Sequence, residues 1–316
     1  MTPFESYIAP ARVVPGAWRA LVGLLTVGVI WVIATALVLL TWAVAQLSTG
    51  LATDGLNDRL ARFSQNGEPI EILLLLLSFS GIWLGVYTAA HWLHRHRLRD
   101  VLSAWRTGAL RGFGKGVVLT AITVAVFTGF TWAIGLVPAE PTQTADLQTW
   151  LIWLLPIALA VLIQASAEEL FFRGYLLQQL AVRSDHWLVW AVIPSILFGC
   201  LHYGGREGLL DAYYVGTTFM MGLCFSVLVW RSGSLWPAIG MHVSNNLYAL
   251  LIAGHSSEAT GTELWLYPED SFEETLQFAP LLYLIVLIAL ISPLGRVFNA
   301  RTRTARERDD FRLISG

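Results

Sequence analysis

The sequence predicts an all-α membrane protein, a polytopic bundle of about eight transmembrane helices that forms a single membrane-embedded domain over residues 1–316. Hydrophobic residues make up 55% of the chain and charged residues only 13%, whereas about a quarter of the residues of a soluble domain are charged. The apolar runs reach the ~20 residues that a helix needs to cross the core of a bilayer. The membrane lipid bilayer is therefore the first expected partner of this chain.

Eight apolar runs define the predicted spans. The first run is longer than the apolar core of a signal peptide, which has about 7–15 residues, so we expect it to be retained as a span. The segment 100–114 mixes aromatic, apolar and basic residues, and we expect it to lie along the membrane surface. In chain order, the spans are expected at 18–47, 70–93, 115–136, 149–174, 187–203, 212–231, 234–254 and 279–298.

Basic residues fall in alternate loops, and this pattern orients the predicted bundle. The loops at 137–148 and 255–277 contain no Lys or Arg. Because short cytoplasmic loops are rich in Lys and Arg, both termini are expected in the cytoplasm. The basic segments include Arg95, Arg97, Arg99, Arg106, Arg111 and Lys115 after the second span, and Arg296, Arg301, Arg303, Arg306, Arg308 and Arg312 at the end of the chain.

Two further features of the charged residues indicate the source of the protein and limit its expected partners. Lys115 is the one lysine among the 20 basic residues, and this excess of arginine favours a bacterial protein of the inner (plasma) membrane. The net charge of −2 is too close to zero to predict binding to nucleic acid.

The fourth predicted span contains three charged residues, Glu168, Glu169 and Arg173. Each unpaired charge near the centre of a bilayer costs on the order of 2.5–3.5 kcal/mol, so these side chains are expected to face the protein interior and to pair. Glu169 and Arg173 are four residues apart, on one face of a helix. This spacing predicts that Arg173 neutralises Glu169 and that Glu168 faces another group. A purely structural ion network of all three remains the alternative.

Polar residues also interrupt two later apolar spans. Phe198 precedes His202 by one helical turn, so its ring is expected to pack against the imidazole. His242 and Asn246 are likewise four residues apart and project together. A lone membrane histidine can be a helix-contact residue, but together these spans supply a base, hydrogen-bond donors and an amide, the groups that hydrolysis requires.

These residues resemble a known family. Glu168-Glu169-x-x-x-Arg173, Phe198-x-x-x-His202 and His242-x-x-x-Asn246 are similar to the three ordered motifs of the CPBP family, which comprises the CAAX prenyl endopeptidases and the bacteriocin-processing and immunity (Abi) proteins of bacteria. The similar region covers about 149–250, a motif-bearing core within the single domain. The resemblance implies an intramembrane endopeptidase with a core of eight helices.

The resemblance also implies a role for each motif residue. Glu168 would be the general base that activates water, and His202 would help to hold that water. His242 and Asn246 would donate hydrogen bonds to the oxyanion of the tetrahedral intermediate. The supporting residues would be Glu169, Arg173 and Phe198.

The family has also been described as metalloproteases, which leaves two mechanisms to compare. A catalytic zinc ion takes three protein ligands and water, and Glu168, His202 and His242 could supply these ligands, with Glu169 as an alternative carboxylate. The sequence has no His-Glu-x-x-His motif, and an Asn such as Asn246 is a better oxyanion donor than zinc ligand. A glutamate mechanism without a cofactor is therefore expected.

The predicted site has one geometric difficulty and two rival interpretations. In straight spans Glu168 and His242 lie toward the cytoplasmic half and His202 toward the other end, so they meet only if helix four breaks near Gly174 or span five is displaced. The rivals are a non-enzymatic immunity or regulatory scaffold and, less favoured, a proton-coupled transporter. For the protease, the expected substrate is a membrane-associated or leader-bearing peptide or protein, with or without a lipid.

Overall fold

The computed structural model describes residues 1–48, 55, 68–105, 107–136, 140–206, 209–255 and 261–300. Arg106, the arginines from 301 to 312 and part of the loop 255–277 therefore lie outside the described residues. The helices and strands are, in order, α1 (Pro3–Ile8), η1 (Ala9–Arg12), α2 (Ala17–Ser48), α4 (Pro69–Ser78), α5 (Ser80–Thr88), η2 (Ala89–Leu93), α6 (Leu98–Leu102), α7 (Ala109–Ala133), β1 (Thr142–Gln143), α8 (Leu147–Glu169), η3 (Leu170–Leu176), α9 (Leu177–Ala181), η4 (Leu188–Val192), α10 (Ile193–Cys200), α11 (Leu210–Ser232), α12 (Trp236–Leu247), η5 (Tyr248–Ile252), β2 (Ala253–His255), β3 (Trp265–Tyr267), α13 (Glu269–Leu276), α14 (Ala279–Ile291) and η7 (Pro293–Phe298).

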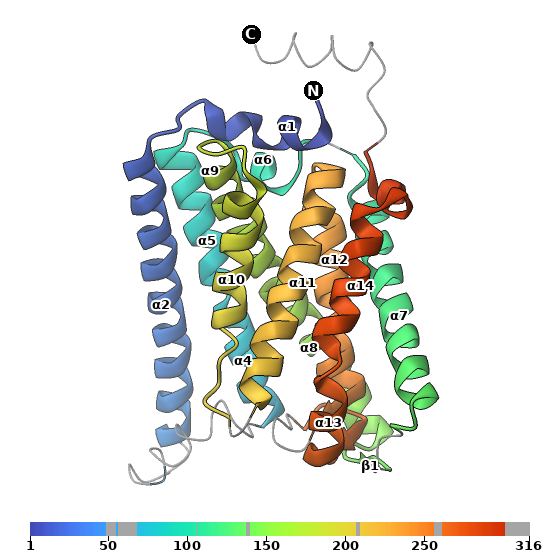
Figure 1. The fold of residues 1–316 in the computed structure, drawn as a ribbon. Coiled ribbons are helices and arrows are strands. Elements are labelled where there is room, and N and C mark those ends of the chain that lie inside the picture. Colours follow the sequence, from blue (N-terminus) through green and yellow to red (C-terminus); the bar gives the residue numbers. More distant parts are fainter. Residues whose placement is uncertain are drawn as a thin grey trace.

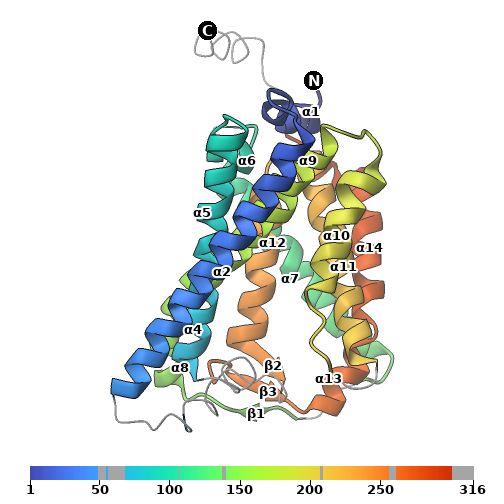
Figure 2. The same ribbon diagram turned by 90° about the vertical axis from the view of Figure 1, so that its left-hand side faces the viewer.

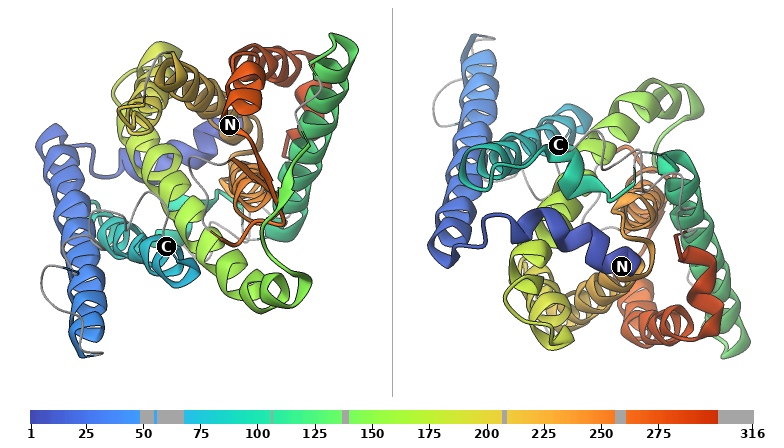
Figure 3. Two further views of the ribbon diagram at one scale, coloured as in Figure 1. Left: turned by 90° about the horizontal axis from the view of Figure 1, so that it is seen from below. Right: turned by 90° about the horizontal axis from the view of Figure 1, so that it is seen from above.

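The long helices run between two ends of the bundle (Figure 1). The N-terminus, α1 and α6 lie at one end, which we call the N-terminal end, and the short strands and α13 lie at the opposite end (Figures 1 and 2). Viewed along the bundle, α12 is enclosed by its neighbours (Figure 3), and it packs against α7, α8 and α11. Residues 237–243 of α12 are all buried, so this helix lines the interior of the protein.

The outer surface of the bundle is apolar, as expected for a protein whose solvent is lipid. Exposed large hydrophobic side chains follow α2, α7, α8 and α14. In the described part of the chain, six helices are long and apolar enough to cross a membrane. These helices support an integral membrane protein. The six helices are Ala17–Ser48, Pro69–Leu93, Ala109–Ala133, Leu147–Ala181, Leu210–Ser232 and Glu273–Ile291.

The predicted number of about eight spans is not confirmed, because two of the predicted segments form shorter helices. The apolar helix Leu188–Cys200 is about 20 Å long at 1.5 Å per residue, less than the ~30 Å of the hydrocarbon core. After it, residues 203–206 have no regular structure. The other segment, Trp236–Ile252, is α-helical to Leu247 and then π-helical.

Several boundaries also differ from the sequence-based prediction. The third span begins at Ala109 rather than at 115. In the segment that we expected along the membrane surface, a short helix ends at Leu102. A small three-stranded sheet in order β1-β3-β2 was not predicted; β1 pairs antiparallel and β2 parallel with β3. Strands of two or three residues are too short to give an alternating pattern in a sequence.

Helix ends follow local chemistry. The Asp146 side chain caps α8 by accepting from the backbone N–H groups of Gln148 and Thr149, donors that have no partner inside the helix. At the C-terminal end of α11, Gly233 adopts a left-handed conformation with φ of 65°. A glycine reaches this conformation without the steric cost of a Cβ atom. These two signals set the start of one long helix and the turn into α12.

The fourth span does not break near Gly174. It runs from Leu147 to Ala181 and widens into the π-helical segment η3, which contains Gly174. A Cβ atom at Gly174 would lie 2.7 Å from Cγ1 of Val101, so the glycine permits close packing here. The carbonyl of Arg173 in this segment accepts a hydrogen bond of 3.1 Å from the Tyr7 hydroxyl. The same hydroxyl donates to the Val101 carbonyl at 2.6 Å.

We expect Tyr7→Phe to lower the free energy of unfolding by about 1–3 kcal/mol, because two buried carbonyls would lose their donor. Tyr7 is completely buried. Thermal unfolding in detergent would measure the change, with Tyr87→Phe as the control because Tyr87 is 45% exposed. Equal stability of the two variants would show that the Tyr7 hydroxyl does not hold α1 against η3.

Candidate active site

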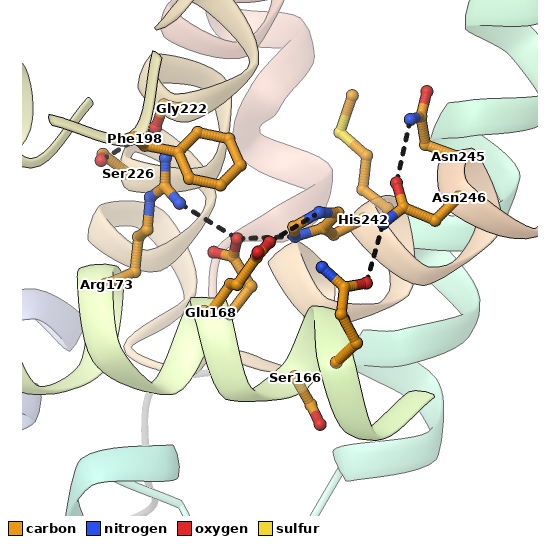
Figure 4. Close-up of polar contacts among 12 residues, drawn as sticks. Ser166, Glu168, Arg173, Phe198, Gly222, Ser226, His242, Asn245 and Asn246 are labelled. Carbon is orange, nitrogen blue, oxygen red and sulfur yellow. Dashed lines mark hydrogen bonds and ion pairs between the residues drawn. The ribbon is translucent and has the colours of Figure 1, made fainter. Parts of the chain in front are cut away.

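Three helical segments bring the predicted residues together in the interior of the bundle (Figure 4). Glu168 and Glu169 are the last two residues of α8, and Arg173 follows in η3. His242 lies on the enclosed helix α12. Phe198 lies near the end of α10. The charged groups thus face protein rather than lipid, as their cost in a bilayer requires.

Glu169 is the centre of a buried polar network. Its Oε1 atom lies 3.1 Å from Nη1 of Arg173 and 3.0 Å from Nδ1 of His242. Glu169 and Arg173 are completely buried, and His242 is 2% exposed. The predicted pairing of Glu169 with Arg173 is confirmed. Since the carboxylate only accepts hydrogen bonds, Nδ1 of His242 carries a proton and donates a hydrogen bond to Glu169.

The guanidinium of Arg173 is surrounded by aromatic rings as well as by Glu169. Its Cζ atom lies 4.4 Å from the ring centre of Phe198, 5.1 Å from that of Phe225 and 5.6 Å from that of Phe172. The ring faces attract a cation, and more strongly where water is excluded. Phe225 also stacks on His242, with ring centres 5.2 Å apart. The same aromatic group therefore holds both the cation and the imidazole.

Gly222 of α11 leaves room for this guanidinium (Figure 4). A Cβ atom at Gly222 would lie 2.4 Å from Nη2 of Arg173 and 3.0 Å from Cβ of Ser195. The sequence analysis did not identify Gly222, because its importance comes from the position of Arg173 on another helix.

We expect Gly222→Ala to lower stability by about 1–3 kcal/mol, the usual cost of overpacking a buried site. Gly216→Ala on the same helix is the matched control, because its Cβ would meet Pro280 at an ordinary 3.6 Å. The control should be neutral or stabilising by up to about 0.5–1 kcal/mol, since alanine favours a helix more than glycine. Thermal unfolding of both variants tests the difference, and a Gly222→Ala protein as stable as the control would contradict it.

Glu168 faces the other ring nitrogen of His242. Its Oε2 atom lies 3.4 Å from Nε2 of His242, and 13% of its side chain is exposed. This oxygen has no hydrogen-bond partner among the described residues. The imidazole therefore lies between two carboxylates: Glu169, whose Oε1 contacts both Arg173 and His242, and Glu168, which is partly exposed and whose Oε2 can still accept a hydrogen bond.

A second polar group continues along α12. Asn246 donates from Nδ2 to Oε1 of Gln164 at 3.0 Å, and Gln164 precedes Glu168 by four residues on α8. Asn245 donates to Oδ1 of Asn246 at 3.3 Å, and the Tyr283 hydroxyl donates to Asn245 at 3.1 Å. The Asn246 amide is thereby oriented, and its second N–H hydrogen can serve another acceptor.

Gln164, Asn245 and Tyr283 were not predicted as site residues from the sequence. Gln164 carried a usable signal, because it lies one turn before Glu168 within an otherwise apolar run. Tyr283 gave none, since its contact with Asn245 depends on the packing of α14.

His202 lies in the turn that follows α10. Its Nδ1 atom donates to the carbonyl of Phe198 at 2.8 Å, and its ring packs edge-on against Phe198 with centres 4.8 Å apart. The predicted packing of this pair is confirmed. Phe198 also contacts His242, with ring centres 5.7 Å apart. With the proton on Nδ1, Nε2 of His202 is left as an acceptor.

The short helix that ends with α10 explains how His202 can lie near Glu168, although straight spans would place them at different depths in the membrane. The helix Leu188–Cys200 starts near the N-terminal end and ends after 13 residues (Figure 1). The fourth span ends with Ala181 at this same N-terminal end, and Glu168 lies 13 residues before Ala181. His202 therefore reaches the level of Glu168 because its helix is short.

The residues proposed for zinc do not form a metal site here. Across the described ranges, no three His, Cys, Asp or Glu side chains are placed to hold one metal ion. The two ring nitrogens of His242 face Glu169 and Glu168. The set Glu168, His202 and His242 does not fit a zinc ion in this arrangement.

Comparison with known proteins identifies the same region. Residues 148–248 match the family described as type II CAAX prenyl endopeptidase, Rce1-like. The uncharacterized protein YyaK of Bacillus subtilis (strain 168) is 34% identical over 112 residues, which cover 35% of this chain and 38% of that protein. The match thus spans well under half of the curated relative. No solved structure matches the chain. All seven predicted site residues fall within 148–248, and the family matched there is the CAAX prenyl endopeptidase family that the three motifs resemble.

Proposed function

We propose that this protein is an intramembrane endopeptidase that hydrolyses a peptide bond of a membrane-associated peptide or protein, leader-bearing or lipidated. The observation that carries the proposal is the contrast between two adjacent carboxylates in the protein interior. Glu169 is fully buried and paired with Arg173 and His242. Glu168 is 13% exposed, and among the described residues its one ion pair is with His242 at 3.4 Å. The match of 148–248 to a peptidase family supports this interpretation.

In the proposed reaction Glu168 is the general base. Arg173 balances Glu169, so one further proton shared between Glu168 and His242 makes the buried cluster neutral. With this proton on His242, the Glu168 carboxylate can accept a proton from water. The water oxygen bonds to the carbonyl carbon of the substrate. When the C–N bond breaks, the proton on Glu168 passes to the leaving amine nitrogen.

Three other side chains would act on the water and on the oxyanion. Nε2 of His202 is an acceptor that can orient the water. The Nε2–H of His242, which is no longer attracted to a carboxylate once Glu168 holds the proton from water, and the second N–H of Asn246 would donate hydrogen bonds to the negative charge that develops on the carbonyl oxygen. Fixed donors of this kind are worth several kcal/mol in a site from which water is excluded. The glutamate mechanism needs no cofactor, and no step is assigned to zinc because the residues present do not gather around a metal position.

The second candidate function is a non-enzymatic immunity or regulatory scaffold. The buried network of Glu169, Arg173 and His242 favours it, since these groups pair with one another and could serve only to join α8, η3 and α12. A scaffold, however, needs no additional carboxylate at Glu168. The two candidates therefore differ in whether they require the Glu168 charge.

We also propose that the N-terminal end faces the cytoplasm of a bacterial cell. Arg95, Arg97 and Arg99 are exposed and lie just before and within α6, at that end of the bundle (Figure 1). Basic residues in short loops favour the cytoplasmic side of an inner membrane.

Mass spectrometry of peptide termini tests the proposed function. Wild-type and Glu168→Gln proteins would be expressed in a host strain that lacks its native copy, and the termini of membrane peptides would be compared. The proposal predicts new termini only with the wild type, and these termini would identify the substrate class. Identical profiles from two stably inserted proteins would favour the scaffold.

A further inference from the structure

The turn after His202 is held by the carboxylate of Asp211, in the first turn of α11. Oδ1 of Asp211 accepts from the backbone N–H of Gly204 at 2.9 Å and from Nη1 of Arg206 at 2.9 Å. Oδ2 accepts from the backbone N–H of Arg206 at 2.8 Å. Asp211 is 6% exposed. One buried carboxylate thus satisfies three donors of a segment that has no regular structure.

Arg206 connects this carboxylate to His202. The same Nη1 atom that contacts Asp211 also donates to the backbone carbonyl of His202 at 3.3 Å. The guanidinium lies over the ring of Tyr214, with Cζ 4.0 Å from the ring centre, and the Tyr214 hydroxyl is 2.6 Å from Nε2 of His255 in β2. Arg206 is therefore fixed on both sides, by a carboxylate and by an aromatic ring that is itself held by the sheet.

Two glycines allow the chain to make this turn. Gly205 has a φ of +72°. This conformation is unfavourable for any residue that has a Cβ atom, but not for glycine. A Cβ atom at Gly204 would lie 2.5 Å from Nη1 of Arg206, so a side chain there would displace the guanidinium from Asp211. The sequence His202-Tyr203-Gly204-Gly205-Arg206 is thus suited to fold the arginine back toward the histidine.

His202 needs such support because it lies beyond the last residue of α10, Cys200. Helical hydrogen bonds no longer fix the backbone on its C-terminal side. The ring is oriented from the other side by one bond, from Nδ1 to the Phe198 carbonyl. If the turn relaxed, the His202 backbone could rotate, this bond would weaken, and the proton could move to Nε2.

We propose that Asp211, acting through Arg206, is a positioning residue that keeps His202 in the form with its proton on Nδ1 and its Nε2 toward the reacting water. The proposal rests on the proposed peptidase function for the consequence of this positioning, although the positioning itself can be measured without a substrate. An aspartate in the first turn of a helix also stabilises the helix through its dipole. A role limited to that effect would change stability but not the state of the His202 ring.

The test uses the full chain in lipid nanodiscs with 15N-labelled imidazole rings. The His202 signals would be assigned by their loss in His202→Gln. The test variant, Asp211→Asn, places an amide opposite donors that need a carboxylate. The control is Asp185→Asn, because Asp185 is exposed and lies beyond α9 at the N-terminal end. The wild type and the control should show His202 with its proton on Nδ1. Asp211→Asn should show a mixture of both tautomers.

Kinetics on the peptide identified by terminal mass spectrometry give the second readout. We expect Asp211→Asn to lower kcat by roughly 10- to 100-fold, since a misplaced catalytic group costs about this much, with little change in KM. Arg206→Lys is the second variant, because it keeps the charge beside Asp211 but lacks the planar guanidinium that packs over the Tyr214 ring. It should shift the tautomer in the same direction and by less, and it remains informative if Asp211→Asn does not fold.

Wild-type His202 spectra in both variants would overturn the proposal, whether or not the protein cleaves peptides. A shifted tautomer with unchanged kcat would also overturn it, because positioning would then have no effect on the reaction. If the wild-type protein cleaved no peptide but the variants shifted the tautomer, the peptidase function would fail and the positioning of His202 by Asp211 would stand.

Discussion

A Glu168→Gln protein is expected to lose cleavage activity by on the order of 10²–10⁴-fold, the usual contribution of a general base. Glutamine has the size of glutamate but cannot accept and hold a proton from water. The rate would be measured as kcat/KM on the substrate peptide. Glu71→Gln is the matched control, because Glu71 is a buried helical glutamate whose contact with the Glu68 N–H a glutamine can also make.

The same substitution should leave the protein at least as stable as the wild type. The one ion pair of Glu168 in the part of the chain described is with Nε2 of His242 at 3.4 Å, and His242 can remain neutral when residue 168 is an amide, so little stabilisation is lost. Burying an unbalanced charge is itself costly. An inactive Glu168→Gln protein that was also unfolded, or an active one, would contradict the assignment of Glu168 as the base.

Arg173→Met is expected to lower the free energy of unfolding by about 3–5 kcal/mol. The substitution would leave the carboxylate of Glu169 buried beside apolar groups, and an uncompensated buried charge has a cost of this size. Arg173 is completely buried, with its guanidinium against Glu169 and three phenylalanine rings. Thermal or denaturant unfolding in detergent would measure the loss.

The double variant Glu169→Gln, Arg173→Met is the control for this prediction. Removing both charges can be nearly neutral when the volume is conserved, so the double variant should recover much of the lost stability. The Cβ atom of Gly222→Ala would meet the Arg173 guanidinium. The effects of Gly222→Ala and Arg173→Met on stability should therefore also be non-additive. A double variant less stable than Arg173→Met would show that the ion pair does not carry the effect.

Sequence periodicity predicted the local part of the site. The pairs Glu169–Arg173 and Phe198–His202 are each four residues apart, and a helix places such residues side by side. The membrane setting followed equally well from composition and from the length of the apolar runs. These inferences depend on helix geometry and on the cost of burying polar groups in lipid, which the sequence alone determines.

The features that were missed depend on packing between distant segments. The run 187–203 is apolar enough to be interpreted as a span, yet its helix ends at Cys200. Non-helical backbone is tolerated at membrane depth only where the protein satisfies its polar groups, and here Asp211 does so for Gly204 and Arg206. At η3 the Arg173 carbonyl likewise contacts the Tyr7 hydroxyl, 166 residues away in the sequence, and no local pattern predicts this contact.

The measurement that tests the account most directly is cleavage of the substrate peptide in water enriched in 18O. If Glu168 activates water, the new C-terminal carboxylate from the wild-type protein carries one 18O atom, and Glu168→Gln yields no labelled product above background. Cleavage without uptake of 18O, or equal labelled product from both proteins, would show that the peptide bond is not broken by water that Glu168 activates.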